Sequence, residues 1–314
     1  NRAFVTVPRR RFGIPSTLNY IDLNGDTDPV LKPYPSMRAN RDFVSVYRPR
    51  VDVCGRLWVV DTGLLEVPGK ILRPPSIIIF DLRTDQQILR HEIEPALLVS
   101  NRTTGGLTSI TVDVTRDSCD DAHAYINDLA TNTMLVFSYK QKSLWRFEHP
   151  SFSHDAGAAN FTVGAHNIPW TDGLFSIALS EAHGGGRTAY YHPFVATQEF
   201  SISTNVLKDR NGNFSKNFKV CVRGAYSQSG SHDYHSGTKT LLFANVAQDA
   251  ISCWKVESPL RSNNMALVAQ DHALLLYISD LKVVGDDVWI LVNQMPRFVY
   301  SQLDYRDKNF IIYK

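Results

Sequence analysis

One short pattern, an apolar strand with an aromatic residue near its start, recurs six times along the chain. The copies begin 46 to 67 residues apart, which is enough for four short strands and their turns. The aromatic residues that mark the copies are Phe4, Trp58, Tyr125, Tyr190, Phe243 and Trp289. Most copies follow an apolar strand and precede another. The repeat predicts an all-β protein, a six-bladed β-propeller formed as a single domain over residues 1–314.

The first and last repeats are incomplete. The first begins at its second strand, "AFVTVP", and the last ends at its third strand, "NFIIYK". We therefore expect a natural N-terminal lead-in, missing from this sequence, that supplies both strands and joins the first blade to the last. Closing the ring in this way protects sheet edges that would otherwise pair with other chains.

The tripeptide Asp61-Thr62-Gly63 is the one that carries the catalytic carboxylate of aspartic proteases. That chemistry needs two facing carboxylates that share a proton, and the tripeptide occurs once. Asp61 also lies at a repeat position whose residue type varies from copy to copy. These counterparts are Val7, Asp128, Pro193, Val246 and Val292. We interpret Asp61 as a strand-end residue that accepts backbone hydrogen bonds.

Charge and glycosylation sequons bear on the partners and the compartment. The chain carries 33 basic and 31 acidic side chains, a formal charge of +2, so nothing in its charge favours nucleic acid or an anionic membrane as a partner. No apolar run is long enough to span a bilayer. Asn101, Asn160 and Asn213 each begin an Asn-x-Ser/Thr sequon beside turn-like residues. These sequons predict a secreted, extracellular glycoprotein.

The four cysteines have no Cys-x-x-Cys spacing, which argues against a zinc site and leaves disulfides or thiols. Cys54 and Cys119 both lie in the turn between the first and second strands, in consecutive repeats. Since neighbouring blades hold such turns side by side, we predict a Cys54–Cys119 disulfide. Cys221 and Cys253 form a second candidate pair, with the alternative that Cys253 bonds to a partner beyond Lys314.

Longer segments resemble the yellow/major royal jelly protein family of insects. They include "NRAFVTVPRRRFGIPSTLNYIDL", "CDDAHAYINDL", "SLWRFEHPSF" and "CWKVESPL", and they follow the family order over essentially the whole chain. The resemblance implies a secreted six-bladed propeller. Family members include cuticle pigmentation proteins, dopachrome-converting proteins, and salivary proteins that bind biogenic amines. The chain departs from the family at "RGAYS", where Ala225 replaces the usual proline, and at Cys221, which has no clear family counterpart.

The resemblance also suggests a ligand site. Innermost strands and adjoining loops of a propeller line its channel, where a small ligand would bind. In the amine-binding relatives a hydroxyl, an amide and apolar groups contact the ligand, and the motif matches place these roles on Ser279, Asn293, Met295 and Phe175. The same kind of segment supplies Ser109 and Asp280. An aromatic amine needs such a mixture of apolar surface and oxygen acceptors. For Phe175 and Met295 the alternative is ordinary core packing.

Other chemistry has less support in the sequence. There is no Gly-x-Ser-x-Gly turn for a nucleophilic serine. The "HGGGR" segment from His183 to Arg187 lies between two strands, so we interpret it as a hairpin turn and not as a phosphate-binding loop. The histidines are scattered over different repeats without paired spacing, and we predict neither a metal site nor a cofactor. They include His123, His149, His166, His192 and His232.

Three functions remain open at this point. The first is a secreted protein that binds small aromatic amines or catechol derivatives, in pigmentation or as a scavenger, without being an enzyme. The second is a dopachrome-converting enzyme of melanin formation, a tautomerase or decarboxylase. A catalyst would need an acid or base near the reacting proton, and Asp280 and His166 are the candidates. The third is a structural cuticle protein with a vestigial pocket.

Overall fold

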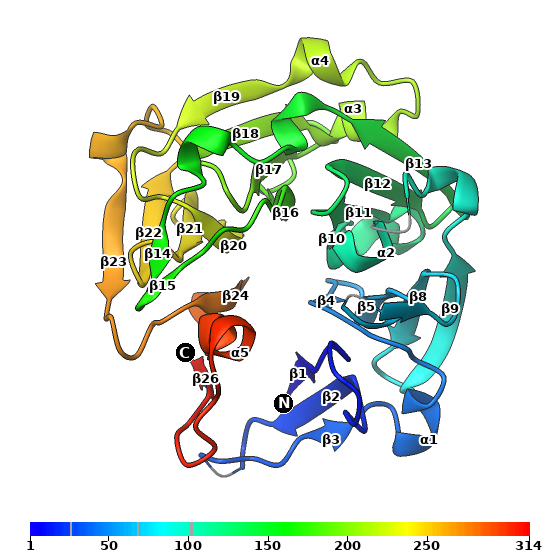
Figure 1. Cartoon of the computed structure of the whole chain (residues 1–314). Coiled ribbons are helices and arrows are strands. Elements are labelled where there is room, and N and C mark those ends of the chain that lie inside the picture. Colours follow the sequence, from blue (N-terminus) through cyan, green and yellow to red (C-terminus); the bar gives the residue numbers. More distant parts are fainter. Residues whose placement is uncertain (26, 68, 101–102) are drawn as a thin grey trace. The chain divides into compact units, whose positions relative to one another are not determined.

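The computed structural model describes residues 1–25, 27–67, 69–100 and 103–314. The chain divides into two compact units, Asn1–Phe147 and Glu148–Lys314, each of which is described by itself. Strands dominate both units (Figure 1). The longest α-helix in the described part of the chain is α5 (Met295–Tyr300), with six residues. No helix among the described residues has the length and apolar character needed to cross a bilayer.

Three antiparallel sheets form the first unit. The first has the order β1-β2-β3, the second β4-β5-β8-β9 and the third β10-β11-β12-β13. Their strands are β1 (Arg2–Thr6), β2 (Leu18–Asp22), β3 (Lys32–Pro33), β4 (Arg50–Val51), β5 (Arg56–Asp61), β8 (Ser76–Asp81), β9 (Gln86–Glu92), β10 (Leu107–Asp113), β11 (His123–Asp128), β12 (Thr133–Ser138) and β13 (Ser143–Glu148), whose last residue opens the second unit. Smaller elements are the hairpin β6 (Leu64–Glu66) with β7 (Gly69–Ile71) and the helices α1 (Met37–Asn40) and α2 (Thr103–Gly106).

Three further antiparallel sheets form the second unit, in the orders β16-β17-β18-β19, β20-β21-β22-β23 and β24-β25-β26. Their strands are β16 (Leu174–Leu179), β17 (Thr188–Pro193), β18 (Gln198–Ser203), β19 (Lys219–Val222), β20 (Ser229–His235), β21 (Thr240–Asn245), β22 (Ala250–Lys255), β23 (Ala266–Gln270), β24 (Ile278–Val284), β25 (Asp287–Asn293) and β26 (Phe310–Tyr313). The hairpin β14 (Thr162–Val163) with β15 (His166–Asn167) and the helices α3 (Thr204–Lys208), α4 (Phe214–Asn217) and α5 complete the unit.

The predicted six-bladed β-propeller is confirmed. The six aromatic markers lie on β1, β5, β11, β17, β21 and β25, and each of these strands holds the same place in its repeat. The first sheet begins at the repeat's second strand and the last ends at its third, as the sequence predicts. Within each unit, apolar side chains pack between consecutive sheets. In the first unit Trp58, Ile79 and Ile126 belong to one buried cluster.

Asp61 proves to be the strand-end residue that the repeat predicts. Its carboxylate accepts hydrogen bonds from the backbone N–H groups of Val44 (2.9 Å), Ser45 (2.8 Å) and Gly63 (3.2 Å). The residue is only 2% exposed. These bonds connect the end of β5 to the chain that precedes β4, so the Asp-Thr-Gly segment has a structural role here.

The predicted Cys54–Cys119 disulfide is confirmed, with the two Cα atoms 5.9 Å apart. Cys54 lies in the turn between β4 and β5, and Cys119 lies in the turn between β10 and β11. The bond therefore joins equivalent turns of two consecutive sheets.

The expected pairing of Cys221 with Cys253 is wrong, because both residues are free thiols. Cys221 on β19 packs into the apolar cluster that contains Trp254. Cys253 precedes Trp254 on β22 and packs into the cluster that contains Ile278. Successive side chains of a strand point to opposite faces. Cys221 therefore packs against the Trp254 face of the sheet β20–β23, while the side chain of Cys253 lies on the other face of that sheet.

Two of the three sequon asparagines can be located. Asn160 and Asn213 are both exposed. The Asn160 amide oxygen accepts a hydrogen bond from Asn167, and that of Asn213 accepts one from the N–H of Lys216 in α4. Asn101 lies outside the described residues. Glycosylation at the three positions stays a prediction.

Candidate functional site

Most of the predicted ligand residues gather on the last sheet. Ser279 and Asp280 lie on β24, Asn293 ends β25, and Met295 begins α5. All four are half-buried. Ser109 lies on β10 of the first unit, where it is half-buried and its backbone forms a β-bridge with that of Arg48. Ser109 thus belongs to a different unit from the other four residues, and its role in a ligand site stays a prediction.

Local structure already uses the polar groups of these residues. The Ser279 hydroxyl donates to the Leu291 carbonyl (3.0 Å), and the Asn293 amide oxygen accepts from the Met295 N–H (2.9 Å). Asp280 accepts from the Ser231 hydroxyl and the Lys282 ammonium, each at 2.8 Å. Asn293 keeps a second lone pair on its oxygen, whereas Asp280 is held in an ion pair.

Phe175 is linked to this sheet by a series of aromatic contacts. We call the residues that make them the aromatic cluster: Trp170, Phe175, Phe194, Tyr277 and Tyr300. The ring centroids of Phe175 and Phe194 are 4.9 Å apart, and those of Phe194 and Tyr277 are 6.2 Å apart. Trp170 lies 5.8 Å from Tyr277 and stacks on Tyr300 at 6.3 Å. Because Tyr300 ends α5, the cluster extends from β16 to the helix that Met295 begins.

The two ends of the aromatic cluster differ in exposure. Phe175 is 7% exposed, and a methyl group added at Gly230 would lie 3.7 Å from its ring and 3.1 Å from the Ile278 carbonyl oxygen. Phe175 is thus packed like a core residue, and its role in a ligand site stays a prediction. Tyr300 is 40% exposed, and His166 stacks on it with ring centroids 6.2 Å apart. The accessible end therefore presents flat rings.

Acidic charge lies beside the accessible end. Burial raises the pKa of the Tyr300 phenol, and the nearby negative charge of Asp172 adds to the effect, while a hydrogen bond from Trp170 opposes it. Sequence reasoning missed Trp170, Phe194, Tyr277 and Tyr300. Their signal was present as aromatic residues in "NIPWTDGLF", "HPF", "LLLYISD" and "MPRFVY", directly beside the segments that carry the predicted ligand residues.

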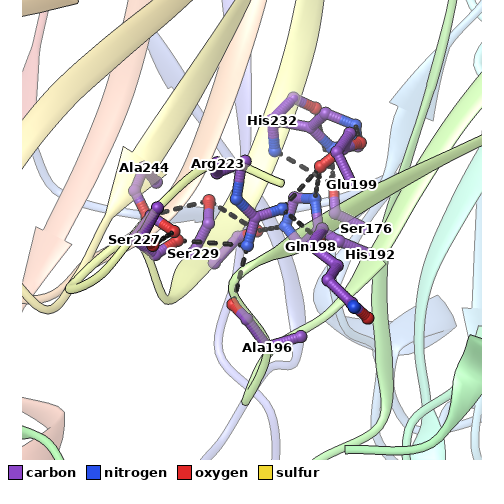
Figure 2. Close-up of polar contacts among 12 residues, drawn as sticks. Ser176, His192, Ala196, Gln198, Glu199, Arg223, Ser227, Ser229, His232 and Ala244 are labelled. Carbon is purple, nitrogen blue, oxygen red and sulfur yellow. Dashed lines mark hydrogen bonds and ion pairs between the residues drawn. The ribbon is translucent and has the colours of Figure 1, made fainter. Parts of the chain in front are cut away.

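A second group of polar residues lies inside the same unit, and we call it the buried network. It consists of Ser176 on β16, His192 on β17, Glu199 on β18, Arg223 after β19 and His232 on β20 (Figure 2). Each of the five is no more than 5% exposed. Strand register supports the contacts, because Ser176 pairs with His192 across β16 and β17. The β17–β18 hairpin, paired up to Tyr191 and Phe200, brings the Glu199 side chain within 2.8 Å of His192.

Glu199 is the centre of the buried network. Its Oε2 atom lies 2.8 Å from His192 Nδ1 and 2.5 Å from Arg223 Nη1. Its Oε1 atom lies 3.1 Å from His232 Nε2, but the two atoms are not aligned for a hydrogen bond. Burial alone would raise the pKa of Glu199, yet its contacts with His192 and His232 outweigh burial and hold the pKa well below its ordinary value.

Arg223 and the two histidines have further partners. Arg223 donates to the carbonyl oxygens of Ala196 (2.8 Å), Gln198 (2.8 Å) and Ser227 (3.1 Å). His192 Nε2 lies 2.9 Å from the Gly230 carbonyl oxygen, and His232 Nδ1 lies 2.7 Å from the Ser176 hydroxyl. Burial lowers the pKa of His192 to about 4. The network thus connects the four strands β16, β17, β18 and β20, and it holds the Gly230 backbone that packs against Phe175.

A polar pocket of about 330 Å³ lies elsewhere on the second unit. Its walls include His183, Arg187 and Lys219, with Glu181 beside them. The "HGGGR" segment forms part of the wall and is a hairpin turn, as the sequence predicts, because His183 and Gly186 exchange backbone hydrogen bonds. It precedes a strand, so it does not present amide groups at the start of a helix.

The strand order and register define the class of protein as a β-propeller. A chain in the crystal structure of a nidogen/laminin complex has the same kind of fold, with a TM-score of 0.53, 10% sequence identity, and coverage of 92% of this chain and 84% of that one. Within this class of fold, the sequence assigns the chain to one family. The family model of the major royal jelly protein matches residues 44–314, so this chain belongs to that family, as its resemblance predicts.

Relatives within the family are similar along the whole chain. The chain is 40% identical over 331 residues to the L-dopachrome tautomerase yellow-f of Drosophila melanogaster. This match covers 100% of this chain and 76% of the relative. It is 34% identical over 330 residues to Protein yellow of Drosophila melanogaster, with coverage of 100% and 60%. The chain thus spans about three fifths of the length of Protein yellow.

Proposed function

We propose that this yellow-family chain binds a small aromatic amine or catechol derivative at the accessible end of the aromatic cluster. The observation that supports the proposal is the stacked row of His166, Tyr300 and Trp170, which lies on the unit that also carries Asn293 and Met295. Flat aromatic rings bind by stacking on such side chains. The charge of Asp172 and the oxygen of Asn293 suit an ammonium group.

The test of binding is a calorimetric titration with serotonin, dopamine and octopamine. Asn293→Ala removes an acceptor for the ammonium group, which costs roughly 1.5–3 kcal/mol and a ten- to hundredfold loss of affinity. Asn293→Asp is the matched variant, because it keeps an acceptor for the Met295 N–H and adds a negative charge. We expect it to bind amines more tightly than the unchanged protein.

Thermal melting supplies the folding control for both variants. Tyr300→Ala should also weaken binding, whereas Tyr305→Ala removes an equally large but 84% exposed ring and should have no effect. Unchanged affinity in a folded Asn293→Ala variant, with equal effects of the two tyrosine changes, would place the ligand elsewhere.

A second candidate function is dopachrome conversion, which the name of the yellow-f relative favours. Tautomerisation moves a proton, so it needs a base within hydrogen-bond reach of the substrate. Asp280 is tied to Lys282 and Ser231, while His166 stacks on Tyr300 at the accessible end. His166 is therefore the better candidate for the base.

The enzyme hypothesis predicts that His166→Gln lowers the rate of dopachrome decay by about 10²–10⁴-fold, the range of general-base effects. Amine affinity should fall less than in Tyr300→Ala or Asn293→Ala, because His166→Gln removes one ring of the stacked row and keeps Tyr300 and Asn293. His183→Gln is the matched control, since His183 lines the polar pocket described above and is not part of the aromatic cluster. Decay at the same rate in both variants, or no decay with the unchanged protein, would leave binding as the function.

We also propose that the protein is secreted and glycosylated. The Cys54–Cys119 disulfide is typical of oxidising compartments, and Asn160 and Asn213 are exposed. Secreted protein from insect cells should lose mass on enzymatic deglycosylation. Retention inside the cells without any loss of mass would contradict this proposal.

A further inference from the structure

We propose that His192, His232 and Glu199 of the buried network form a site for one divalent transition-metal ion of the zinc type. One ligand atom from each residue lies within 4.8 Å of the others, and all three side chains are buried. The residues come from β17, β20 and β18, so the site depends on the packing of two sheets. This explains how a site can exist without paired histidine spacing in the sequence.

The hydrogen bonding of His192 supports a cation between it and Glu199. Both ring nitrogens face acceptors, because Nε2 lies 2.9 Å from the Gly230 carbonyl oxygen and Nδ1 lies 2.8 Å from Glu199 Oε2. A neutral imidazole has one N–H and can serve only one of them. If the N–H serves Gly230, the Nδ1 lone pair faces a carboxylate. That contact is favourable only with a second proton on the ring or a metal ion beside Nδ1.

His232 presents the same arrangement. Its Nδ1 lies 2.7 Å from the Ser176 hydroxyl, and its Nε2 points toward Glu199. Within the described residues, neither His232 Nε2 nor Glu199 Oε1 has a hydrogen-bond partner, although both atoms are buried. Unsatisfied buried polar atoms are costly and rare in folded proteins. A metal ion between them would satisfy both atoms at once.

The surroundings also match the usual support of metal ligands. A ligating histidine commonly donates its other N–H to a backbone carbonyl or another polar group, which fixes the ring orientation. Gly230 and Ser176 occupy those positions for His192 and His232. Arg223 holds Glu199 Oε2 and leaves Oε1 directed at His232.

The donor set indicates the kind of ion. Two imidazole nitrogens and one carboxylate oxygen suit zinc and similar transition metals, whereas calcium and magnesium prefer oxygen ligands alone. Arg223 cancels the charge of Glu199, so the ion would keep most of its own charge inside the protein. The competing explanation of the same geometry is a second proton on His192, which would supply a single positive charge.

Metal content distinguishes the two explanations. Because the site is buried, the ion must be taken up during folding, so the chain should be produced in zinc-supplemented medium and dialysed against a chelator. We expect one zinc per folded chain by elemental mass spectrometry. His232→Gln should lose the metal, while His235→Gln, on the same strand but bonded to Asp286, should keep it.

A second measurement does not depend on a variant that folds. Protein produced with cobalt(II) in place of zinc should show visible absorption bands of a nitrogen- and oxygen-coordinated ion. Folded protein without stoichiometric zinc or cobalt bands would overturn the proposal, and so would equal metal content in the two histidine variants.

Discussion

Arg223→Met should destabilise the second unit by roughly 3–5 kcal/mol, the cost of removing one partner from a buried ion pair. The Arg223 and Glu199 side chains are 0% and 2% exposed, so water cannot replace the lost contact. The substitution would leave the Glu199 carboxylate without its guanidinium. It would also remove the donors that serve the carbonyl groups of Ala196, Gln198 and Ser227.

The measurement is the free energy of unfolding in urea. Lys239→Met is the matched control, because Lys239 and Glu257 also form a close pair, at 2.6 Å, but half of each side chain is exposed. We expect a much smaller change there, since water solvates both charges. Replacing both partners, in Arg223→Met with Glu199→Leu, should recover part of the loss. Equal stability of the Arg223 and Lys239 variants would refute the prediction.

Removal of the Cys54–Cys119 disulfide should cost the first unit about 4 kcal/mol, because the bond closes a chain segment of 65 residues. The constraint acts mainly on the unfolded chain, whose freedom increases when the bond is lost. The test compares urea unfolding of the oxidised protein with that of the Cys54→Ser, Cys119→Ser double variant. An unchanged transition would show that the bond adds no stability.

Cys221→Ser serves as the control for the loss of a cysteine. Cys221 is a partly exposed free thiol on β19, and its replacement leaves every disulfide in place. We expect a smaller change than in the double variant. Peptide mapping without reduction supplies an independent check, since free thiols at Cys54 and Cys119 in the folded protein would be incompatible with the bond.

The fold and the first disulfide could be predicted because the repeat is local and regular. An aromatic residue near the start of each second strand fixes the register of that repeat, as at Trp58 and Tyr125. Once the repeats are aligned, equivalent turns can be compared directly. Cys54 and Cys119 lie in such turns, so their pairing followed from the alignment alone.

Other features depend on which face of a strand each residue occupies. Cys221 and Cys253 looked like partners only because they were the cysteines left over. The segment "HPFVATQE" indicates a hairpin that brings His192 and Glu199 together. The contact of Glu199 with His232, however, requires the packing of β16 against β20. Sequence spacing carries no such information, because the strands belong to different sheets.

The ligand residues show a similar limit. Resemblance placed Ser279, Asn293 and Met295 near one another, and the structure gathers them on one sheet and the start of α5. It could not show that Ser279 and Asn293 already bond to backbone groups. The rings of Trp170 and Tyr300 come from distant segments and meet only after the unit has folded.

The bond between Cys54 and Cys119 has a consequence for how the first unit opens. The segment between the two cysteines contains β5, β8, β9 and β10, which belong to two different sheets. Separation of those sheets is limited by a covalent link that holds their turns within a few ångströms. We therefore expect the two sheets to open together in partial unfolding, although their hydrogen bonds divide the four strands between two blades.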